Sequence, residues 1–452
     1  MHRFLTYSAC ILAFVLCLLP SFAATPTNTL PIVYITTTNN QAIDSKETYV
    51  TGSLRIDPKN SGYPALASVP AQFKGRGNWT WNGFDKKPYR IKFDTKQAVL
   101  GMPNNRHWCL LAYADDYLGF LKGPAGFIIS EALGLRWTPR IRPVELVINN
   151  QYQGLYFLTE HVRIAGNRVH ITEQADNATD SVTGGWLVEI DNYWSENNIE
   201  FDEGNGQHVM VSLKEPEVLS SAQRTYLENQ IYGLNDAIYG SSSTDLWNRL
   251  DLDEAVKFYL VQEIMEDCES YHGSCFLYKD RDRNGQTDKW KFGPVWDFGN
   301  AYDRHQETWI YDTPVFAQYW IGQLATWPEF QQKVREYWWI YYHAHKDSVR
   351  STIRAFADQI ESAAKRDAEV WKNTQNYRDN SNFSDVRDRF FRRYDWRINW
   401  LYSQWNEGTE PNTWDIESTQ EEPSRGHKIL RDGHLLIECD GRVYNLLGQT
   451  VR

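Results

Sequence analysis

Three observations predict an α+β fold, with a β-rich N-terminal part and a helical C-terminal part. Between residues 31 and 170, short apolar runs alternate with turn residues, which is typical of successive strands. From residue 328 to 405, Trp, Tyr and Phe recur every three or four positions, the spacing of a helix face. Between these parts, residues 275–296 have the pattern of a β-hairpin. At 452 residues the chain exceeds the usual size of one core, so two lobes or domains are expected.

The expected strands of the N-terminal part are apolar or alternating runs. Asn149-Asn150 lies between two apolar runs, as a hairpin turn should. One segment differs, because Leu118 to Leu133 has helical spacing and Gly134 is placed like a helix C-cap. The strand-like runs are IVYITT, Val50 to Ile56, PYRIKFD, HWCLLAYA and VELVINNQYQGLYFLTEHV.

The middle of the chain is expected to add strands and then helices. GWLVEID and HVMVSLK, between residues 180 and 215, read as strands, and the periodicity turns helical from Ser221 to Val261. The aromatic residues of 328–405 are interpreted as a buried stripe, and a ligand-stacking face is the alternative.

The hairpin carries acidic residues at its outer ends. Its strands are expected at Cys275 to Tyr278 and Lys289 to Trp296, with DRDRNGQTD as the turn. Antiparallel pairing would bring the acids of residues 267–269 back toward Asp297. A divalent metal needs carboxylates this close together, so the sequence predicts one acidic cleft.

The turn itself resembles the opening of a calcium-binding loop. Asp280, Asp282, Asn284 and Gly285 fit a D-x-D-x-N-G pattern, but Lys291 stands where a bidentate Glu is required. A solvated hairpin turn is the simpler interpretation.

Composition limits the kinds of partner. The formal charge of −11 argues against a duplex-binding surface, so no nucleic-acid partner is expected. Local basic clusters at residues 86–92 and 387–397 leave room for an anionic ligand in one pocket. The 19 Trp residues suit either cores or stacking platforms for sugars and bases, and composition does not choose between them.

Both ends of the chain predict export. Residues 1–24 read as a signal peptide, with Arg3, an apolar run from Ile11 to Leu19 and an A-x-A-like site at residues 21–23. No later stretch is long and apolar enough to span a membrane, and Cys17 lacks the context of a lipid anchor. A polar, acidic linker at residues 406–426 precedes a short C-terminal module at residues 427–452.

Four cysteines follow the expected signal peptide, and their spacing fits no zinc site. Cys268 and Cys275 could form a local disulfide or remain buried thiols. The histidines have no metal-triad spacing and no Gly-x-Ser-x-Gly elbow is present, so hydrolysis by zinc or by a serine triad has no support. A sugar-active enzyme with paired carboxylates is a weaker possibility.

A second candidate cluster is the segment 74–79, KGRGNW. Its glycines would let backbone N–H groups approach a ligand, and Lys74 and Arg76 would meet phosphate oxygens, although a simple basic turn has the same composition. In the following KKPYRIK run, Arg90 and Lys92 would share one strand face, with solvent as the default. Glu160 ends an apolar strand, where it could pair with a buried Lys or lie on the surface.

These segments, in this order, resemble the CotH kinase family of spore-coat and secreted bacterial proteins. The likeness covers about residues 31–400, within an expected kinase-like domain at residues 31–405. It is carried by KGRGNWTW, KKPYRIKFD, LGMPNNRHWCLLAYADD, QGLYFLTEHV, GGWLVEID and FLYKDRD followed by GPVWDFGNAYD. The C-terminal DGRVYNLLGQTVR resembles the sorting tail of proteins exported by type IX secretion in Bacteroidetes.

The resemblance implies an atypical protein kinase-like, two-lobed fold that transfers phosphate from ATP with Mg²⁺ to Ser or Thr of a protein partner. It implies that Glu269 and Asp267 orient the attacking hydroxyl, and that Asp297 and Asn300 hold the metal. It also implies a nucleotide-binding set consisting of Lys74, Arg76, Asn78, Lys87 and Glu160.

Three positions depart from the family pattern. Members commonly read N-x-D-x-Y where this chain has Asp267 and Glu269. An Asp or Asn often follows the WDF segment where Gly299 stands, and Lys122-Gly123 replaces Arg-Asn. These changes allow a second interpretation: a nucleotide-binding pseudokinase, or a non-catalytic surface module that binds protein or glycan on the same fold.

Overall fold

The computed structural model describes residues 25–191, 199–202, 208–304, 307–312 and 319–405, and four strands between residues 427 and 451. The chain divides into two compact units, residues 1–405 and 406–452, and each is described by itself. The first unit contains both helices and strands, which confirms the α+β prediction.

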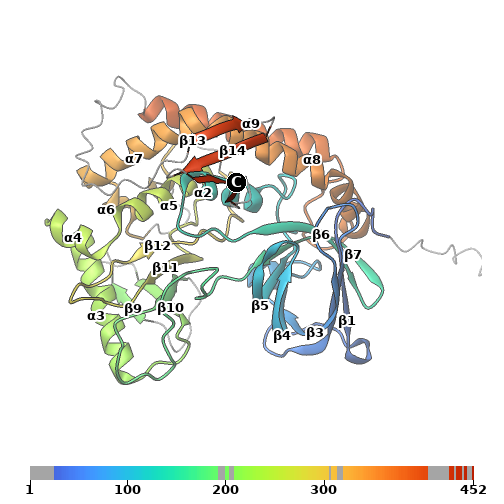
Figure 1. Cartoon of the computed structure of the whole chain (residues 1–452), viewed down its shortest axis with the longest axis horizontal. Helices are drawn as coiled ribbons and strands as arrows, with labels where there is room; N and C mark the ends of the chain where they lie inside the picture. The colour runs from blue at the N-terminus through green and yellow to red at the C-terminus, as the bar shows by residue number, and fades with distance from the viewer. Residues whose placement is uncertain are drawn as a thin grey trace, which may run out of the picture. The chain divides into compact units, whose positions relative to one another are not determined.

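The N-terminal part of the first unit is a closed seven-stranded barrel (Figure 1). Neighbouring strands pair antiparallel in the order β1-β2-β3-β4-β5-β7-β6. The parallel pairing of β6 with β1, for example Val33 with Leu146, closes the barrel. The strands are β1 (Ile32–Thr37), β2 (Val50–Asp57), β3 (Leu66–Gly75), β4 (Tyr89–Val99), β5 (Met102–Leu111), β6 (Ile141–Ile148) and β7 (Gln151–Glu160).

The alternation of side chains in β4 separates the inside of the barrel from its outer surface. Ile91 and Phe93 are buried in the barrel core, so Arg90 and Lys92 point outward. The turn between β6 and β7 is the predicted Asn149-Asn150, with φ of 49° and 66°. Asn tolerates this left-handed conformation better than most residues, which explains the tight turn.

The predicted helix near residue 118 is α2 (Lys122–Leu133), which begins four residues later than its apolar pattern suggests. Asp116 accounts for the later start, because its carboxylate accepts hydrogen bonds from the backbone N–H groups of Leu118 and Lys122, at 2.7 and 3.0 Å. Gly134 ends the helix with φ 70°, as predicted.

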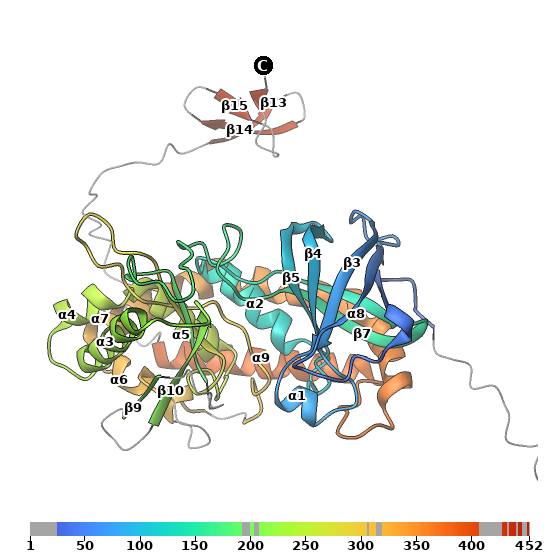
Figure 2. The same ribbon diagram turned by 90° about the horizontal axis from the view of Figure 1, so that it is seen from below.

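The second sheet has the strand order β12-β11-β8-β10-β9 and lies at the opposite end of the first unit from the barrel (Figures 1 and 2). The predicted hairpin is present, because β11 pairs antiparallel with β12 and places Leu277 opposite Phe292. The prediction of a strand reaching Trp296 is wrong: β12 ends at Phe292, two residues before Pro294, which has no N–H for the ladder. The strands are β8 (Trp186–Ile190), β9 (Ile199–Asp202), β10 (His208–Glu215), β11 (Cys275–Lys279) and β12 (Lys291–Phe292).

The hairpin turn uses its acids internally. Lys279 Nζ donates to Asp282 Oδ1 at 2.5 Å, and Lys291 Nζ donates to Asp288 Oδ2 at 2.7 Å. The lysine that excluded a calcium loop on sequence grounds therefore neutralises one of the turn's own carboxylates.

The helices pack around a core rich in aromatic side chains, as their periodicity predicts. Trp320 and Trp338 are buried, and one turn of π-helix at Tyr341–His345 joins α7 to α8. The helices are α1 (Trp79–Asn82), α2, α3 (Ser221–Ile238), α4 (Ser243–Arg249), α5 (Leu252–Ile264), α6 (Ile321–Leu324), α7 (Pro328–Ile340), α8 (Lys346–Trp371) and α9 (Phe383–Trp405).

A buried ion pair joins the barrel to the helices. Lys86, just before β4, lies 2.8 Å from Asp367 on α8, and both side chains are inaccessible to solvent. The same carboxylate accepts a hydrogen bond from the backbone N–H of Leu155 on β7 at 2.8 Å. The pair therefore fixes α8 against the barrel wall.

The three cysteines of the described part, Cys109, Cys268 and Cys275, are buried and form no disulfide, so the disulfide alternative is not realised there. In the second unit, β13 (His427–Arg431), β14 (His434–Cys439), β15 (Arg442–Tyr444) and β16 (Thr450–Val451) form one antiparallel sheet. Among the described residues, no helix has the length and hydropathy that a membrane crossing requires. The expected signal peptide and the linker lie outside the described residues.

Candidate functional site

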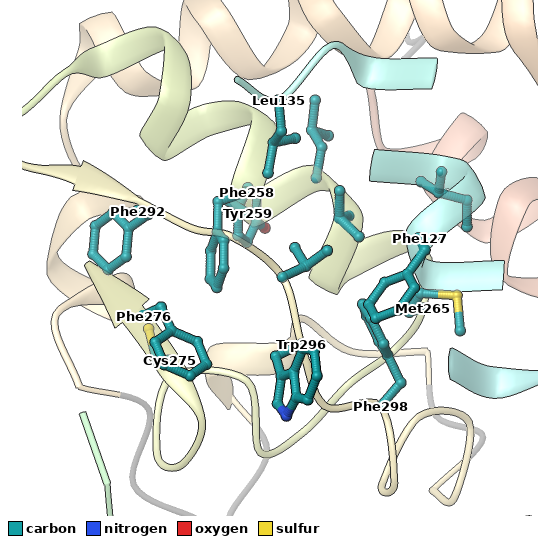
Figure 3. Close-up of a cluster of buried hydrophobic side chains, with 14 of the residues drawn as sticks. Phe127, Leu135, Phe258, Tyr259, Met265, Cys275, Phe276, Phe292, Trp296 and Phe298 are labelled. Carbon is teal, nitrogen blue, oxygen red and sulfur yellow. The ribbon is translucent and has the colours of Figure 1, made fainter. Parts of the chain in front are cut away.

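Asp297 is presented to solvent from between two buried aromatic residues. Trp296 and Phe298 are only 8% and 1% exposed, and both rings contact Phe127 of α2, with centroids 6.3 and 6.2 Å away. Figure 3 shows the two side chains anchored beside Phe127 in the core. Because alternate residues of an extended segment point to opposite sides, this anchoring leaves the intervening carboxylate exposed.

The acids of residues 267–269 lie next to the segment that follows Asp297. The backbone of Asp267 forms an antiparallel bridge with Ala301, and its Oδ1 accepts the Glu269 N–H at 3.3 Å. The Asn300 side-chain N–H₂ donates a hydrogen bond to Glu269 Oε2. The structure therefore brings four of the predicted site residues together, as the hairpin pairing leads one to expect.

Asp115 is a further acid of this site that sequence reasoning did not assign. A Cβ added to Gly299 would lie 3.4 Å from Asp297 Oδ1 and 3.5 Å from Asp115 Oδ2, so the two carboxylates flank this glycine. The available signal was the Asp115-Asp116 pair directly after an apolar strand. An acid at position 299 would crowd both carboxylates.

The electrostatics of the acidic group favour a cation. Burial, and next the nearby Asp297, raise the pKa of Asp115 to about 7. Burial, then Glu269 and Asp297, raise the pKa of Asp267 well above its usual value. Carboxylates held this close repel one another, so their ionised forms are disfavoured until a cation binds between them.

Oxygen donors of this kind suit Mg²⁺. Within the described residues, however, no three Asp, Glu, His or Cys side chains converge closely enough to enclose a metal by themselves. Mg²⁺ is commonly held by one or two carboxylates together with substrate phosphates, so the donor set fits a metal that arrives with a phosphorylated ligand.

Lys122 fixes the loop that carries Gly299. Its Nζ donates to the Gly299 carbonyl at 2.8 Å and to Asp303 Oδ1 at 2.5 Å. A Cβ on the neighbouring Gly123 would lie 2.1 Å from the Tyr113 hydroxyl. Tyr113 thus fills the space where the family pattern has an Asn side chain.

The acids line one wall of a cleft of about 1420 Å³. Residues of the barrel end also line this cleft, and they include Arg76, Asn78 and the exposed Trp79. The Arg76 guanidinium lies 5.5 Å from the Trp296 ring centroid, beside Asp297. Asn78 lines the cleft while accepting a hydrogen bond from Lys46 Nζ at 2.9 Å.

Three predicted nucleotide-binding residues are not among the residues that line the cleft. Lys74 Nζ lies 5.0 Å from the Tyr49 ring centroid, and Lys87 Nζ donates to the Trp81 carbonyl at 2.6 Å. Glu160 is fully buried, so its surface alternative is wrong. Its partners are arginines instead of the suggested lysine: Arg140 at 3.2 Å and Arg168 at 3.9 Å.

Arg90 occupies a position that the sequence did not predict. Its solvent-facing default is wrong, because Arg90 lines the cleft together with His107 and His161. The histidines were set aside because they are scattered in the sequence, yet their ring centroids lie 6.4 Å apart. Strand pairing, which the sequence does not reveal directly, brings them together.

The family model described as CotH kinase protein matches residues 73–401, which is most of the chain. The chain belongs to the CotH kinase family. Every residue assigned above to the cleft lies inside this match, from Arg76 to Asp303. No curated protein matches the chain.

Membership in the CotH kinase family associates the chain with kinase and transferase chemistry as a class. The matched region covers barrel strands β4 to β7, the second sheet and the helices from α1 into α9, so the acidic residues and the barrel residues of the cleft belong to one family domain.

Proposed function

We propose that this protein is an atypical kinase that binds ATP with Mg²⁺ in the cleft and transfers the γ-phosphoryl group to Ser or Thr of a protein partner. The observation that carries the proposal is the position of Asp297. It is held between two buried rings, next to the Trp296 ring that Arg76 approaches, and in the same cleft as Glu269. Phosphoryl transfer depends mainly on this kind of positioning and charge neutralisation.

The acidic wall is assigned to the metal. Asp297 and Asp115 supply carboxylates, and Asn300 supplies its amide oxygen because its nitrogen is bonded to Glu269. Bound Mg²⁺ would neutralise charge on the transferring phosphates. Arg76 lines the same cleft over Trp296, and its guanidinium matches phosphate oxygens.

Glu269 is assigned as the residue that orients the acceptor hydroxyl and accepts its proton. The hydrogen bond from Asn300 holds one of its carboxylate oxygens, and Glu269 lines the cleft that would receive the acceptor. Asp267, whose pKa is raised by burial, is assigned to positioning because its Oδ1 holds the Glu269 backbone.

The proposal includes a two-lobed kinase-like arrangement. The barrel, with Arg76 and Asn78 at its end, would be the nucleotide-gripping lobe, and the second sheet with the helices would carry the acids. The volume of the cleft supports this assignment. At about 1420 Å³ it exceeds the usual range of a small-molecule pocket and leaves room for a peptide beside a nucleotide.

Thermal unfolding of the purified protein with ATP, in the presence and absence of Mg²⁺, tests the binding step. A ligand that binds only the folded state raises stability by RT ln(1 + [L]/Kd), so millimolar ATP at micromolar affinity gives about 4 kcal/mol. Asp297→Ala should lose the Mg²⁺-dependent part of this stabilisation. Asp94→Ala, at an exposed acid of β4, is the matched control. An absence of stabilisation in the parent protein would reject nucleotide binding.

Transfer itself is tested with γ-labelled ATP. The parent protein is incubated with the labelled ATP alone and with the proteins that its native cell secretes. If it binds ATP but neither it nor any of these proteins becomes labelled, it is a pseudokinase. One observation bears on the glycan-binding alternative: Trp309, Trp320, Trp327, Trp338 and Trp339 are buried or half-buried, so they form no exposed stacking groove.

We also propose that the protein is exported, with residues 1–24 removed as a signal peptide and residues 427–452 serving as a type IX sorting tail. The proposal is supported by the sequence of these two segments. Intact mass measurement of the protein recovered outside its native cell tests both cleavages. Recovery of the full 452-residue chain would reject them.

A further inference from the structure

The outer surface of β4, β5 and β7 gathers positive charge on the cleft. Strand pairing places Arg90 beside Cys109 and Lys92 beside His107. Trp108 of β5 pairs with Glu160 of β7. His107 precedes Trp108 and His161 follows Glu160, so the two histidines lie side by side on the outward face. Each strand thus contributes to one basic surface, although no two of these residues adjoin in the sequence.

Two polar groups of this surface have no partner among the described residues. Arg90 forms no ion pair within the described part of the chain, and its buried Nε has no hydrogen-bond partner. The Nδ1 atom of His107 is likewise buried and unpartnered. A buried donor without an acceptor costs free energy, which an oxyanion bound at this surface would recover.

The lowered pKa values of His107 and His161 indicate the same excess of positive charge. Burial, then Arg163, Arg90, Lys92 and Arg168, lower the pKa of His107 to about 3. Burial and then Arg90, Arg76 and Arg168 also lower the pKa of His161 well below its usual value. Of these cations, Arg163 and Arg168 have acidic partners, at 3.5 Å from Glu215 and 3.9 Å from Glu160, whereas Arg90 is unpaired.

We propose that Arg90 and His107, with Arg76 at the edge, form a subsite for the phosphates of an oligophosphate ligand. The inference deepens the proposed function, on which it rests for the identity of the ligand as a nucleotide. It replaces Lys74 and Lys87, which do not line the cleft, with Arg90 as the second phosphate-binding cation. Charge and the planar donors of arginine suit phosphate oxygens.

The test uses inorganic pyrophosphate as the probe and the His107 imidazole as the reporter. The pKa of His107 is measured by NMR in the parent protein with and without pyrophosphate, and its signal is assigned with His107→Gln. An anion beside the ring favours the imidazolium, so pyrophosphate should raise this pKa by at least one unit. Arg90→Gln should weaken pyrophosphate and ATP binding about tenfold to a hundredfold, the usual effect of losing a charged hydrogen bond.

Arg55→Gln is the matched control, since Arg55 lies on the barrel but stacks on Tyr34, with its guanidinium 3.5 Å from that ring. An unchanged His107 pKa on addition of pyrophosphate overturns the subsite, even if ATP still stabilises the protein. A raised pKa without any ATP stabilisation retains the subsite and rejects the nucleotide. Equal pyrophosphate affinity in the parent and in Arg90→Gln also overturns the inference.

Discussion

The side-chain amide of Asn300 donates a hydrogen bond to Glu269 Oε2 and joins the acid loop after α5 to the segment after Asp297. The family pattern has Asp where this chain has Glu269, which is one methylene longer. Its carboxylate reaches the side-chain amide of Asn300, the residue directly after Gly299, where the chain departs from the pattern a second time. The two departures from the pattern are therefore physically linked. The extra methylene of Glu269 extends toward Asn300.

Glu269→Asp should lower phosphate transfer. The shorter side chain would withdraw its carboxylate from Asn300, and a misplacement of about 1 Å can cost on the order of 100-fold in rate. Transfer from labelled ATP under saturating nucleotide measures the effect. Glu269→Gln keeps the length and the hydrogen bond but removes the charge, so it separates placement from proton acceptance. A faster Glu269→Asp enzyme would show that the Asn300 contact hinders turnover.

Gly126→Ala should destabilise the protein and weaken Mg²⁺-dependent binding. A Cβ at this position would lie 2.2 Å from the Phe298 ring, so the ring and the adjacent Asp297 would have to shift. Overpacking of this kind costs about 1–3 kcal/mol, measurable by urea unfolding.

Gly322→Ala is the control for this substitution, because Gly322 lies in α6 and an added Cβ meets nothing within 4 Å. If Gly126→Ala binds ATP and Mg²⁺ like the parent, the Phe298 packing does not position Asp297.

Local patterns in the sequence were sufficient to predict the β-rich N-terminal part, the hairpin and the C-terminal helices. The Asn149-Asn150 turn and the Gly134 cap were predicted because their conformations are determined by a few adjacent residues. The meeting of Asp297 with Glu269 also followed, since a hairpin brings its outer ends together.

The exposure and the partners of a side chain could not be predicted where they depend on which other element packs against its strand. Alternation showed that Arg90 and Lys92 share a face, but a strand pattern does not indicate whether that face meets solvent or a cleft. Glu160 was misjudged for the same reason, because its partners, the half-exposed Arg140 and the buried Arg168, lie outside its own strand. Asp115 meets Asp297 only because the connection from β5 to α2 lies against the segment that follows β12.

The stability of the ligand-free protein should fall in acid partly because of His107. Its pKa is about 3 in the folded state and about 6.5 in an unfolded chain, so between these values the unfolded state binds more protons. The contribution of neutral His107 is complete above pH 6.5 and is lost toward pH 3, by at most about 1.4 kcal/mol per pH unit.

Urea unfolding across this range should show a shallower loss in His107→Gln than in the parent. His170→Gln, at an exposed histidine, should follow the parent curve. Coincident curves for His107→Gln and the parent would indicate that the cationic surroundings do not suppress protonation of this ring.

Lys86→Met should be among the most destabilising single changes in the barrel. It leaves Asp367 as a buried carboxylate that keeps only the Leu155 N–H and the Tyr377 hydroxyl, at 2.8 and 2.7 Å, as partners. Breaking a buried pair from one side costs about 3–5 kcal/mol. Lys59→Met, which breaks the exposed contact with Asp57 at 2.7 Å, should change the free energy of unfolding little. Adding Asp367→Asn to Lys86→Met should recover part of the loss, because the unpaired charge is then removed. Equal effects of Lys86→Met and Lys59→Met would mean that the pair does not hold α8 to the barrel.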